Sequence, residues 1–212
     1  MITEKMLDAL RTDIESRMSP KRLGHTLEVE KMAVRLGELY APDRINELRA
    51  AALLHDITKE YSIDYHIKIC AERDVPLKVD ALYAPKTLHA ITAAALIPEL
   101  YAQLATPDVI GCVRWHTTGR ADMTLLEKLI YLADYIDMSR TFEDCVRLRD
   151  AFWSAEPEKM SIDERHSHLR RVLIMSYDMT MHALIEEGTP ISTDTVEARN
   201  KLVCEEIEQS RK

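Results

Sequence analysis

Apolar residues recur at steps of three and four along almost the whole chain, and this spacing is the strongest constraint on the fold. Ile2, Met6, Leu10 and Ile14 form the first such stripe. Alternation of apolar and polar residues at period two, which a half-buried strand would show, does not persist over any useful length. The pattern therefore predicts an all-α fold.

Capping residues and helix breakers place the ends of the predicted helices. Ser19 precedes Pro20, which suits an N-cap followed by proline at the first helical position. Gly188 is expected to end a long helix, and Pro98 is expected to lie beyond a helix end. The predicted helices are 2–18, 20–40, 43–57, 62–73, 86–97, 107–116, 123–138, 142–153, 161–187 and 194–209.

The chain length fits one domain. Its 212 residues compare with about 150 for a typical domain, and no repeat or Gly/Ser-rich linker divides them. We therefore expect a single all-α domain over 1–212, made of a core at 20–140 and a C-terminal helical extension at 141–212.

Composition and charge exclude several classes of protein. Lys and Arg number 28 and Asp and Glu 36, so the formal net charge is −8, which disfavours binding to a nucleic-acid polymer. No apolar run approaches the ~20 residues of a membrane helix, and acidic residues stand where a signal peptide would be apolar. A cytoplasmic protein without membrane contact is the expectation. The cysteines form no Cys-x-x-Cys pair and are expected to be reduced thiols, mostly in the core: Cys70, Cys112, Cys145 and Cys204.

His55 and Asp56 are the first residues that suggest chemistry. Leu48, Ala52 and His55 lie on one apolar stripe, and Asp56 follows at the predicted end of the same helix. Burying an imidazole and a carboxylate costs free energy unless a partner such as a cation compensates. The alternative is a core histidine hydrogen-bonded to a carbonyl, with Asp56 as an exposed cap.

His25 and Asp134 lie on the buried stripes of other predicted helices. His25 shares the face of Leu36, and Asp134 shares that of Ile130. An aspartate on the buried face of an apolar helix needs a partner, whereas Asp137 is expected to form a surface salt bridge. Imidazole and carboxylate groups together, with no cysteine among them, favour a first-row transition ion, Fe or Mn before others, over a thiolate zinc site.

The other histidines and most aromatic residues are expected to be structural. His166 and His168 stand two residues apart on one predicted helix and so face different ways, while His66 and His182 have no carboxylate neighbour in a comparable setting. All four are assigned to structure or surface. One of the aromatic residues near the candidate site could stack on a nucleobase, although core packing is expected for most of them: Trp115, Tyr131, Tyr135 and Phe142.

The order His25, His55-Asp56, Asp134 resembles the HD superfamily of metal-dependent phosphohydrolases. Further words over about 20–203 resemble its YqeK-like branch: Arg22-x-x-His25-Thr26, Leu54-His55-Asp56-Ile57-Thr58-Lys59, Leu88-His89, His116-Thr117-Thr118-Gly119, Ala133-Asp134-Tyr135-Ile136 with Arg140, and Thr195-x-x-Ala198-x-Asn200. Ala90 departs from the glycine expected after the histidine. The resemblance implies an all-helical symmetrical bis(5'-nucleosyl)-tetraphosphatase with iron in its site. Such an enzyme splits diadenosine tetraphosphate into two ADP by attack of metal-activated water on a phosphoanhydride.

The resemblance also implies roles for individual residues. The implied metal ligands are His25, His55, Asp56 and Asp134. The residues implied to face the substrate are Arg22, Lys59, His89, His116, Thr117 and Arg140, together with Asp56 and Asp134. The implied catalytic residues are Asp56, Lys59 and His116. Two roles stay open for His89 and His116, which would either complete a second metal site or donate hydrogen bonds to phosphates, so one or two ions are expected.

Two other functions stay open from the sequence. One is an enzyme of the same superfamily, a nucleotidase or phosphodiesterase, that acts on another nucleotide. The other is a nucleotide-binding sensor whose site no longer turns over. The expected partner is a dinucleoside polyphosphate or an ADP-like nucleotide, and the chain could form a homodimer.

Overall fold

The computed structural model describes residues 1–211 and contains helices but no strand within that range. The predicted all-α fold is confirmed. The α-helices are α1 (Glu4–Glu15), α2 (Pro20–Tyr40), α3 (Ile45–Leu54), α4 (Ile63–Glu72), α5 (Val79–Tyr83), α6 (Leu88–Leu100), α7 (Pro107–Trp115), α8 (Leu125–Ile136), α9 (Glu143–Trp153), α10 (Ile162–Glu186) and α11 (Thr193–Ser210). The short 3-10 turns are η1 (Pro42–Arg44), η2 (Pro85–Thr87) and η3 (Pro157–Lys159).

All ten predicted helices occur, and two of the expected end signals operate as predicted. Ser19 caps α2 by accepting a hydrogen bond from the backbone N–H of Arg22, and Gly188 follows α10 with φ of 63°. The expectation for Pro98 was wrong, because α6 continues through this residue to Leu100. Pro98 lies in the last turn of α6, where its missing N–H removes only one hydrogen bond near the helix end.

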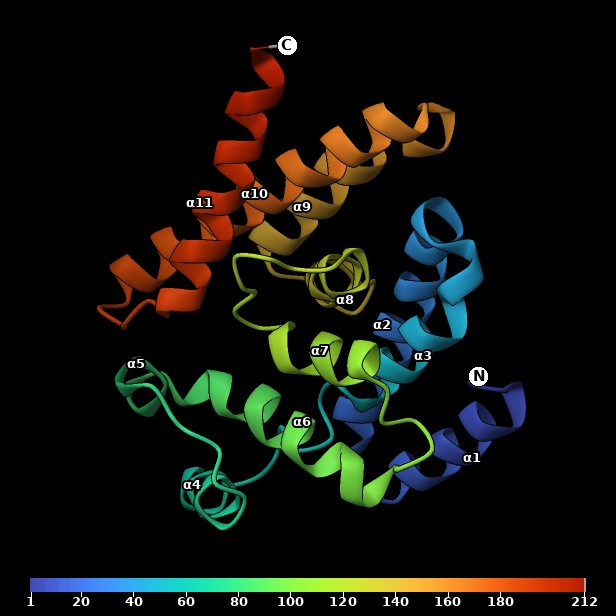
Figure 1. Ribbon diagram of the computed structural model, residues 1–212, viewed down its shortest axis with the longest axis vertical. Helices are drawn as coiled ribbons and strands as arrows, with labels where there is room; N and C mark the ends of the chain where they lie inside the picture. Colours follow the sequence, from blue (N-terminus) through green and yellow to red (C-terminus); the bar gives the residue numbers. More distant parts are fainter. Residues whose placement is uncertain (212) are drawn as a thin grey trace.

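Helix α8 runs through the middle of the molecule (Figure 1). α2, α3 and α7 pack against it, as does α9, which also contacts α10, and α11 packs on α10. The buried apolar faces form one main core that includes Leu7, Leu53, Tyr131 and Leu173. Because this core draws on helices from both ends of the chain, the fold is that of a single domain. The boundary between a core at 20–140 and an extension at 141–212 stays a prediction.

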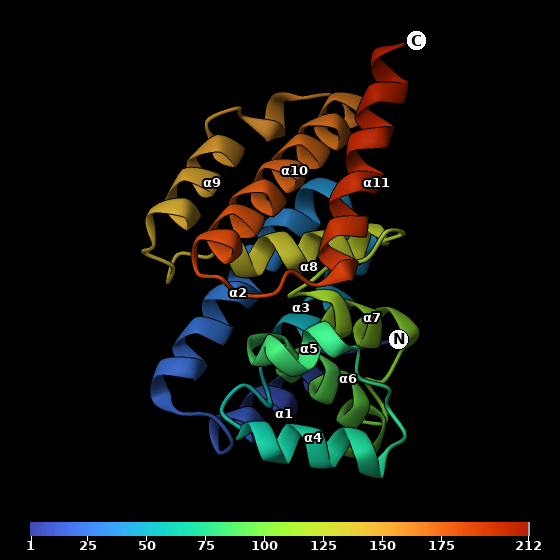
Figure 2. The same cartoon turned by 90° about the vertical axis from the view of Figure 1, so that its left-hand side faces the viewer.

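Helix α5 has no counterpart among the predicted helices. It has five residues and buries none of them, so its sequence shows no apolar stripe. In both views α5 lies beside the loop between α10 and α11 (Figures 1 and 2). Lys78 Nζ lies 2.7 Å from Asp194 Oδ1, and the backbone N–H of Thr193 donates to Asp80 Oδ2 at 2.8 Å. Polar contacts therefore tie α5 to the start of α11.

The loop after α7 is held closely against the C-terminal helices. Gly119 has φ of 66°, a left-handed conformation that glycine adopts without strain. A Cβ at this position would overlap the hydroxyl of Tyr177 on α10. Thr195 on α11 donates through Oγ1 to the carbonyl of Thr118 at 3.0 Å. α10 and α11 therefore fix the position of this loop.

Two expectations from composition can be compared with the structure, one about the cysteines and one about membrane-spanning helices. All four cysteines are free thiols, and Cys70, Cys112 and Cys145 are buried as expected. Cys204 is exposed, which corrects the expectation of a core position, because it lies off the stripe through which α11 packs on α10. Within residues 1–211, no helix combines the length and the apolar character needed to span a bilayer.

Candidate functional site

Four side chains from three parts of the chain converge beside α8. His25 comes from α2, Asp134 from α8, and His55 and Asp56 from the turn after α3. His25 Nε2 lies 3.0 Å from Asp134 Oδ1 and 3.8 Å from Asp56 Oδ2. His55 Nε2 lies 3.4 Å from Asp56 Oδ2. The structure therefore brings together the four residues whose spacing and resemblance suggested a metal site.

The turn that carries His55 and Asp56 begins earlier than predicted. The expected helix 43–57 ends at Leu54, and hydrogen-bonded turns follow, in which the N–H of Lys59 donates to the carbonyl of Asp56 at 3.0 Å. Asp56 is only 3% exposed, so it is not the exposed cap of the alternative interpretation. The early end of α3 directs its carboxylate into the protein.

Backbone carbonyls orient two of the imidazole rings. The Nδ1–H of His55 donates to the carbonyl of Ala52 at 2.6 Å, and the Nδ1–H of His116 donates to that of Val113 at 2.7 Å. In each ring Nε2 is then the atom with a free lone pair, and it lies within the cluster. His55 thus makes the carbonyl hydrogen bond of a core histidine and still offers a nitrogen that can bind an ion.

The donor atoms of the cluster fit a divalent metal ion. His25 Nε2, His55 Nε2 and Asp56 Oδ1 are buried and make no hydrogen bond with the described residues, since the close pairs lack hydrogen-bond geometry. Such atoms destabilise a protein interior unless a ligand satisfies them. Metal–ligand bonds of about 2.0–2.2 Å place neighbouring donor atoms roughly 3 Å apart. The separation of His25 Nε2 and Asp134 Oδ1 matches that spacing.

Asp137 and Ser139 hold the other nitrogen of His25. His25 Nδ1 lies 3.1 Å from Ser139 Oγ and 3.5 Å from Asp137 Oδ2. Against the effect of burial, Asp134 and Asp137 raise the pKa of His25 to about 9. Asp137 is fully buried, so the expectation of a surface salt bridge was wrong. It follows Asp134 by three residues and so shares a helix face with it, which is the signal that could have placed it here.

The two carboxylates of the cluster stay charged although they are buried. Burial alone would raise the pKa of Asp134, but Arg140 holds that pKa well below its usual value. Burial would likewise raise the pKa of Asp56, and His55 holds it well below its usual value. Two anionic groups at one buried point favour occupation by a cation.

His89 and His116 extend the cluster around Asp56. His89 Nε2 lies 3.1 Å from Asp56 Oδ1 and 2.9 Å from His116 Nε2. His55, Asp56 and His116 form a second group of possible metal donors whose atoms lie within 4.8 Å of one another. Burial lowers the pKa of His89 and of His116, which favours their neutral, lone-pair-bearing forms. The geometry admits a second metal site here, but the Nδ1–H of His116 already donates to the carbonyl of Val113, so a neutral His116 cannot donate to a phosphate.

Basic side chains surround the same cluster. Arg22 Nη1 lies 2.5 Å from Asp56 Oδ2, and Arg140 Nη2 lies 2.5 Å from Asp134 Oδ1. Burial lowers the pKa of Lys59, an effect that Asp56 opposes. These three residues place positive charge next to the carboxylates, where a polyphosphate would need it.

A cavity of 420 Å³ opens beside the cluster. Its lining includes Lys59, Thr117, Asp134 and Arg140, all of them residues singled out from the sequence. Thr117 Oγ1 is buried without a hydrogen bond to any described residue, so it is available to a ligand. The other walls come from the segment of α5 and η2 and from the segment 180–195. Thr195 belongs to a motif that resembles the YqeK-like branch, but the other residues of these two walls carry no chemical motif, so their place at the site could not be predicted.

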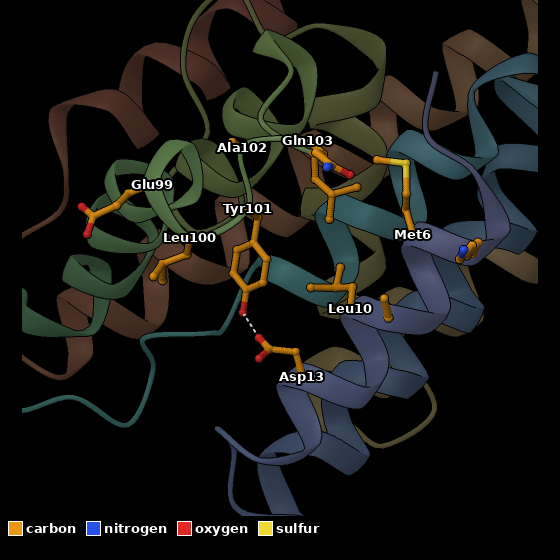
Figure 3. Close-up of a pocket in the computed structure, with 11 residues that line it drawn as sticks. Met6, Leu10, Asp13, Glu99, Leu100, Tyr101, Ala102 and Gln103 are labelled. Carbon is orange, nitrogen blue, oxygen red and sulfur yellow. Dashed lines mark hydrogen bonds between the residues drawn. The ribbon is translucent and has the colours of Figure 1, made fainter.

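A larger cavity of 680 Å³ lies elsewhere, between α1 and the end of α6 with the segment that follows it (Figure 3). Its lining residues come from positions 5–13 and 99–104, and none was predicted as a site residue. The hydroxyl of Tyr101 donates to Asp13 Oδ2 at 2.6 Å there. No group of metal donors lines this cavity, so its size alone does not make it the candidate site.

The remaining histidines are structural or exposed, as predicted. His66 and His168 are buried, and Nε2–H of His168 donates to the carbonyl of Phe152 at 2.9 Å. His166 is exposed on the same helix as His168, so the two do face different ways, and His182 is exposed as well. None of the four belongs to the donor groups around Asp56 and Asp134.

The aromatic residues near the site have different environments. Tyr131 is fully buried and stacks on Tyr135, with ring centroids 5.1 Å apart, and Tyr135 lines the cavity of 420 Å³. Trp115 packs under the guanidinium of Arg114, 4.0 Å from its ring centroid. Phe142 is 70% exposed, so the core packing expected for most of these residues does not apply to it. It precedes α9 as its N-cap and projects from the core.

Comparison with known proteins places the chain in a family. The family profile described as "HD domain" matches residues 22–139, more than half of the chain. The chain therefore belongs to the HD-domain family, and it is a hydrolase of that family. HD domains bind divalent metal ions, in agreement with the donor groups found here.

Individual relatives extend the similarity beyond that stretch. A Bacillus subtilis protein described as "Bis(5'-nucleosyl)-tetraphosphatase, symmetrical" is 30% identical over 190 residues, which cover 90% of this chain and 94% of the relative. A Staphylococcus aureus protein of the same description is 34% identical over 64% of this chain and 69% of its own length. A crystal structure from Clostridium acetobutylicum, described as a "predicted HD superfamily hydrolase involved in NAD metabolism", superposes with a TM-score of 0.77 and 32% identity over 97% of both chains.

Proposed function

We propose that the protein hydrolyses diadenosine tetraphosphate symmetrically into two molecules of ADP. The observation that carries the proposal is the position of the donor cluster. Asp134 belongs both to the cluster and to a cavity that Lys59, Arg140 and Thr117 also line. A polyphosphate in that cavity would lie beside the ion and beside positive charge. The names of the relatives from Bacillus subtilis and Staphylococcus aureus support this choice of substrate.

The proposed metal ligands are His25, His55, Asp56 and Asp134, and the proposed metal is iron. The mixture of imidazole and carboxylate donors favours a first-row transition ion, with manganese as the alternative. When bound, such an ion lowers the pKa of a coordinated water and polarises a phosphoryl oxygen. The hydrogen bond from His55 Nδ1–H to the carbonyl of Ala52 supports this assignment, because it leaves Nε2 free for the ion.

The phosphate chain would be held by the basic residues around the cavity. Hydrolysis forms a bond between the water oxygen and phosphorus, and breaks the bond to the bridging oxygen, whose negative charge leaves with ADP. Catalysis of this reaction is mainly alignment and charge stabilisation. Arg22, Lys59 and Arg140 would neutralise the phosphates, and Thr117 Oγ1, which is buried without a partner among the described residues, would donate to one of them.

His116 has a geometry that suits a proton acceptor. Its Nδ1–H donates a hydrogen bond to the carbonyl of Val113 at 2.7 Å, so Nε2 carries the lone pair. In this tautomer Nε2 can accept a proton from water or bind a second ion, but it cannot donate to a phosphate. We therefore assign His116 to proton acceptance or to a second ion, with His89 beside it at 2.9 Å.

Product analysis tests the proposal. The purified protein is incubated with Fe²⁺ and diadenosine tetraphosphate, and the nucleotides are separated by chromatography. ADP as the sole nucleotide product is expected, with no turnover in Asp56→Asn. AMP together with ATP would show an asymmetric cut and would exclude the symmetrical assignment.

A second candidate is hydrolysis of another nucleotide by the same site. The similarity to the Clostridium acetobutylicum structure, whose description connects that protein with NAD metabolism, favours including this class. The assay therefore also contains NAD and nucleoside mono- and diphosphates. A kcat/KM for one of these above that for diadenosine tetraphosphate would favour the second candidate. Metal-dependent turnover of any of them would exclude a sensor without activity.

A further inference from the structure

The cavity beside the metal cluster is completed by two surface segments. One is the segment of α5 and η2, which contributes Tyr83 and Thr87, and the other is the segment from Thr189 to Thr195. The volume of 420 Å³ is near the lower end of the range for small-molecule pockets, about 300–1,000 Å³. It therefore suits one nucleoside half of a dinucleotide, with the phosphates directed toward Asp134.

Two tyrosines line this cavity, and they differ in how they are held. Tyr135 is fixed, because its ring stacks on Tyr131 and its hydroxyl lies 2.8 Å from Thr180 Oγ1. Tyr83 is 70% exposed although it lines the same cavity. An aromatic ring that remains exposed at the edge of a pocket contributes little to folding and offers a large face to a ligand.

Polar contacts hold Tyr83 at this edge. Lys78 Nζ lies 2.7 Å from Asp194 Oδ1 and 3.2 Å from Thr193 Oγ1, and Asp80 Oδ2 accepts from the N–H of Thr193 at 2.8 Å. α5 is held from two sides, because Ala81 packs against the cluster of Cys70, Leu88 and Ile91, and Lys78 and Asp80 contact the start of α11. The two segments that complete the cavity are therefore connected to each other.

We propose that Tyr83 stacks on the nucleobase of the substrate half that enters this cavity, and that the Lys78–Asp194 ion pair positions Tyr83 for that contact. The inference rests on the proposed function, because it takes the substrate to be a nucleotide. Tyr83 is thus a binding residue for the base, and Lys78 and Asp194 are positioning residues. Stacking tolerates any base, so this contact selects nucleotides over bare polyphosphate without choosing between adenine and guanine.

The first experiment compares two ligands that share phosphates but differ in the base. Calorimetry of the metal-loaded protein gives dissociation constants for ADP and for inorganic tripolyphosphate. Tyr83→Ala is expected to weaken the binding of ADP about tenfold, a typical effect of losing one base–aromatic stack. The binding of tripolyphosphate should not change. Tyr83→Phe should bind ADP like the unmodified protein. Tyr65→Ala is the matched control, because Tyr65 is a 46% exposed tyrosine on α4 that does not line the cavity.

Two results would overturn the inference. One is unchanged ADP binding in Tyr83→Ala, and the other is equal weakening of ADP and tripolyphosphate. Neither result depends on turnover of diadenosine tetraphosphate by the unmodified protein. If ADP binds through Tyr83 but the tetraphosphate is not cleaved, the proposed function fails and the base contact stands.

The second experiment tests the positioning residues. Asp194→Asn is expected to raise KM for diadenosine tetraphosphate several-fold while kcat stays the same, because the catalytic cluster is untouched. In the double variant Tyr83→Ala/Asp194→Asn, the increase in KM should be no greater than in Tyr83→Ala alone, because both changes remove the same contact between Tyr83 and the base. Additive losses, or a fall in kcat without a change in KM, would show that Asp194 does not act through Tyr83.

Discussion

The guanidinium of Arg22 lies 2.5 Å from Asp56 Oδ2, so a residue predicted to face phosphate contacts one of the candidate metal ligands directly. Its Nε is buried and has no hydrogen bond to any described residue. Arg22 therefore has one donor on the carboxylate and another available for a ligand. This arrangement would connect the occupancy of the metal site with the binding of phosphate.

Replacement of Arg22 by Gln should separate these two contacts. We expect KM for diadenosine tetraphosphate to rise about tenfold or more, because a charged hydrogen bond to phosphate is lost, while the metal content stays near that of the unmodified protein. Steady-state kinetics and elemental analysis measure the two effects. A loss of bound metal without a change in KM would assign Arg22 to Asp56 alone.

Replacement of Asp56 by Asn should abolish turnover with only a modest change in the fold. The charge of Asp56 serves the ion, and its loss is expected to lower kcat/KM by more than about 100-fold. Circular dichroism monitors the helices, and metal analysis monitors the site. Activity within a few-fold of the unmodified enzyme would contradict the assignment of Asp56 as a ligand.

His116→Ala distinguishes the roles left open for His116. If His116 accepts a proton, turnover should fall by about 10²–10⁴, and about one tightly bound metal per chain should remain. Metal analysis alongside kinetics provides the comparison. A decrease from two ions to one would instead place His116 in a second metal site.

Lys59→Ala should weaken nucleotide binding and leave the metal content unchanged. Lys59 Nζ lies 3.2 Å from His89 Nε2 and lines the cavity, but it offers no lone pair to a metal when charged. We expect ADP to bind about tenfold more weakly. His166→Ala is the control, because His166 is exposed and outside the cluster, and it should change neither quantity.

Removal of the metal by a chelator should lower the melting temperature. An ion that binds only the folded protein contributes about 2.7 kcal/mol at a free concentration of 100 times its Kd. For a domain of this size that corresponds to roughly 5–10 °C. Differential scanning calorimetry with and without the chelator measures the shift, and Fe²⁺ added back should restore the original value. An unchanged melting temperature in a protein shown to lose its ion would count against a buried site.

The sequence was most informative where local periodicity and chemistry coincide. The stripe of α8 predicted both the helix and the burial of Asp134, and the stripe through Ala52 predicted the burial of His55. Asp137 was misplaced because a carboxylate next to a helix end resembles a surface group. Its burial depends on a contact with His25, which is more than a hundred residues away in sequence.

The walls of the cavity could not be predicted in the same way. Helix α5 is too short to show a periodic stripe, and Tyr83 lies in a stretch without a chemical motif. Its position depends in part on Lys78 and Asp194, which lie far apart in sequence, so that their pairing is a property of the folded chain. Local sequence carries no record of such a tertiary contact.

Part of the cavity wall, including Thr180, Ser192 and Thr195, is encoded well beyond residue 139, where the family-defining stretch ends. The proposed metal ligands all lie within that stretch, so the metal site and the nucleoside side of the cavity are encoded in different parts of the chain. Substitutions at Thr180, Ser192 or Thr195 could therefore change the nucleoside side without changing the donor atoms. Enzymes with the same ion and the same bond-breaking chemistry could diversify in this way toward different nucleotides.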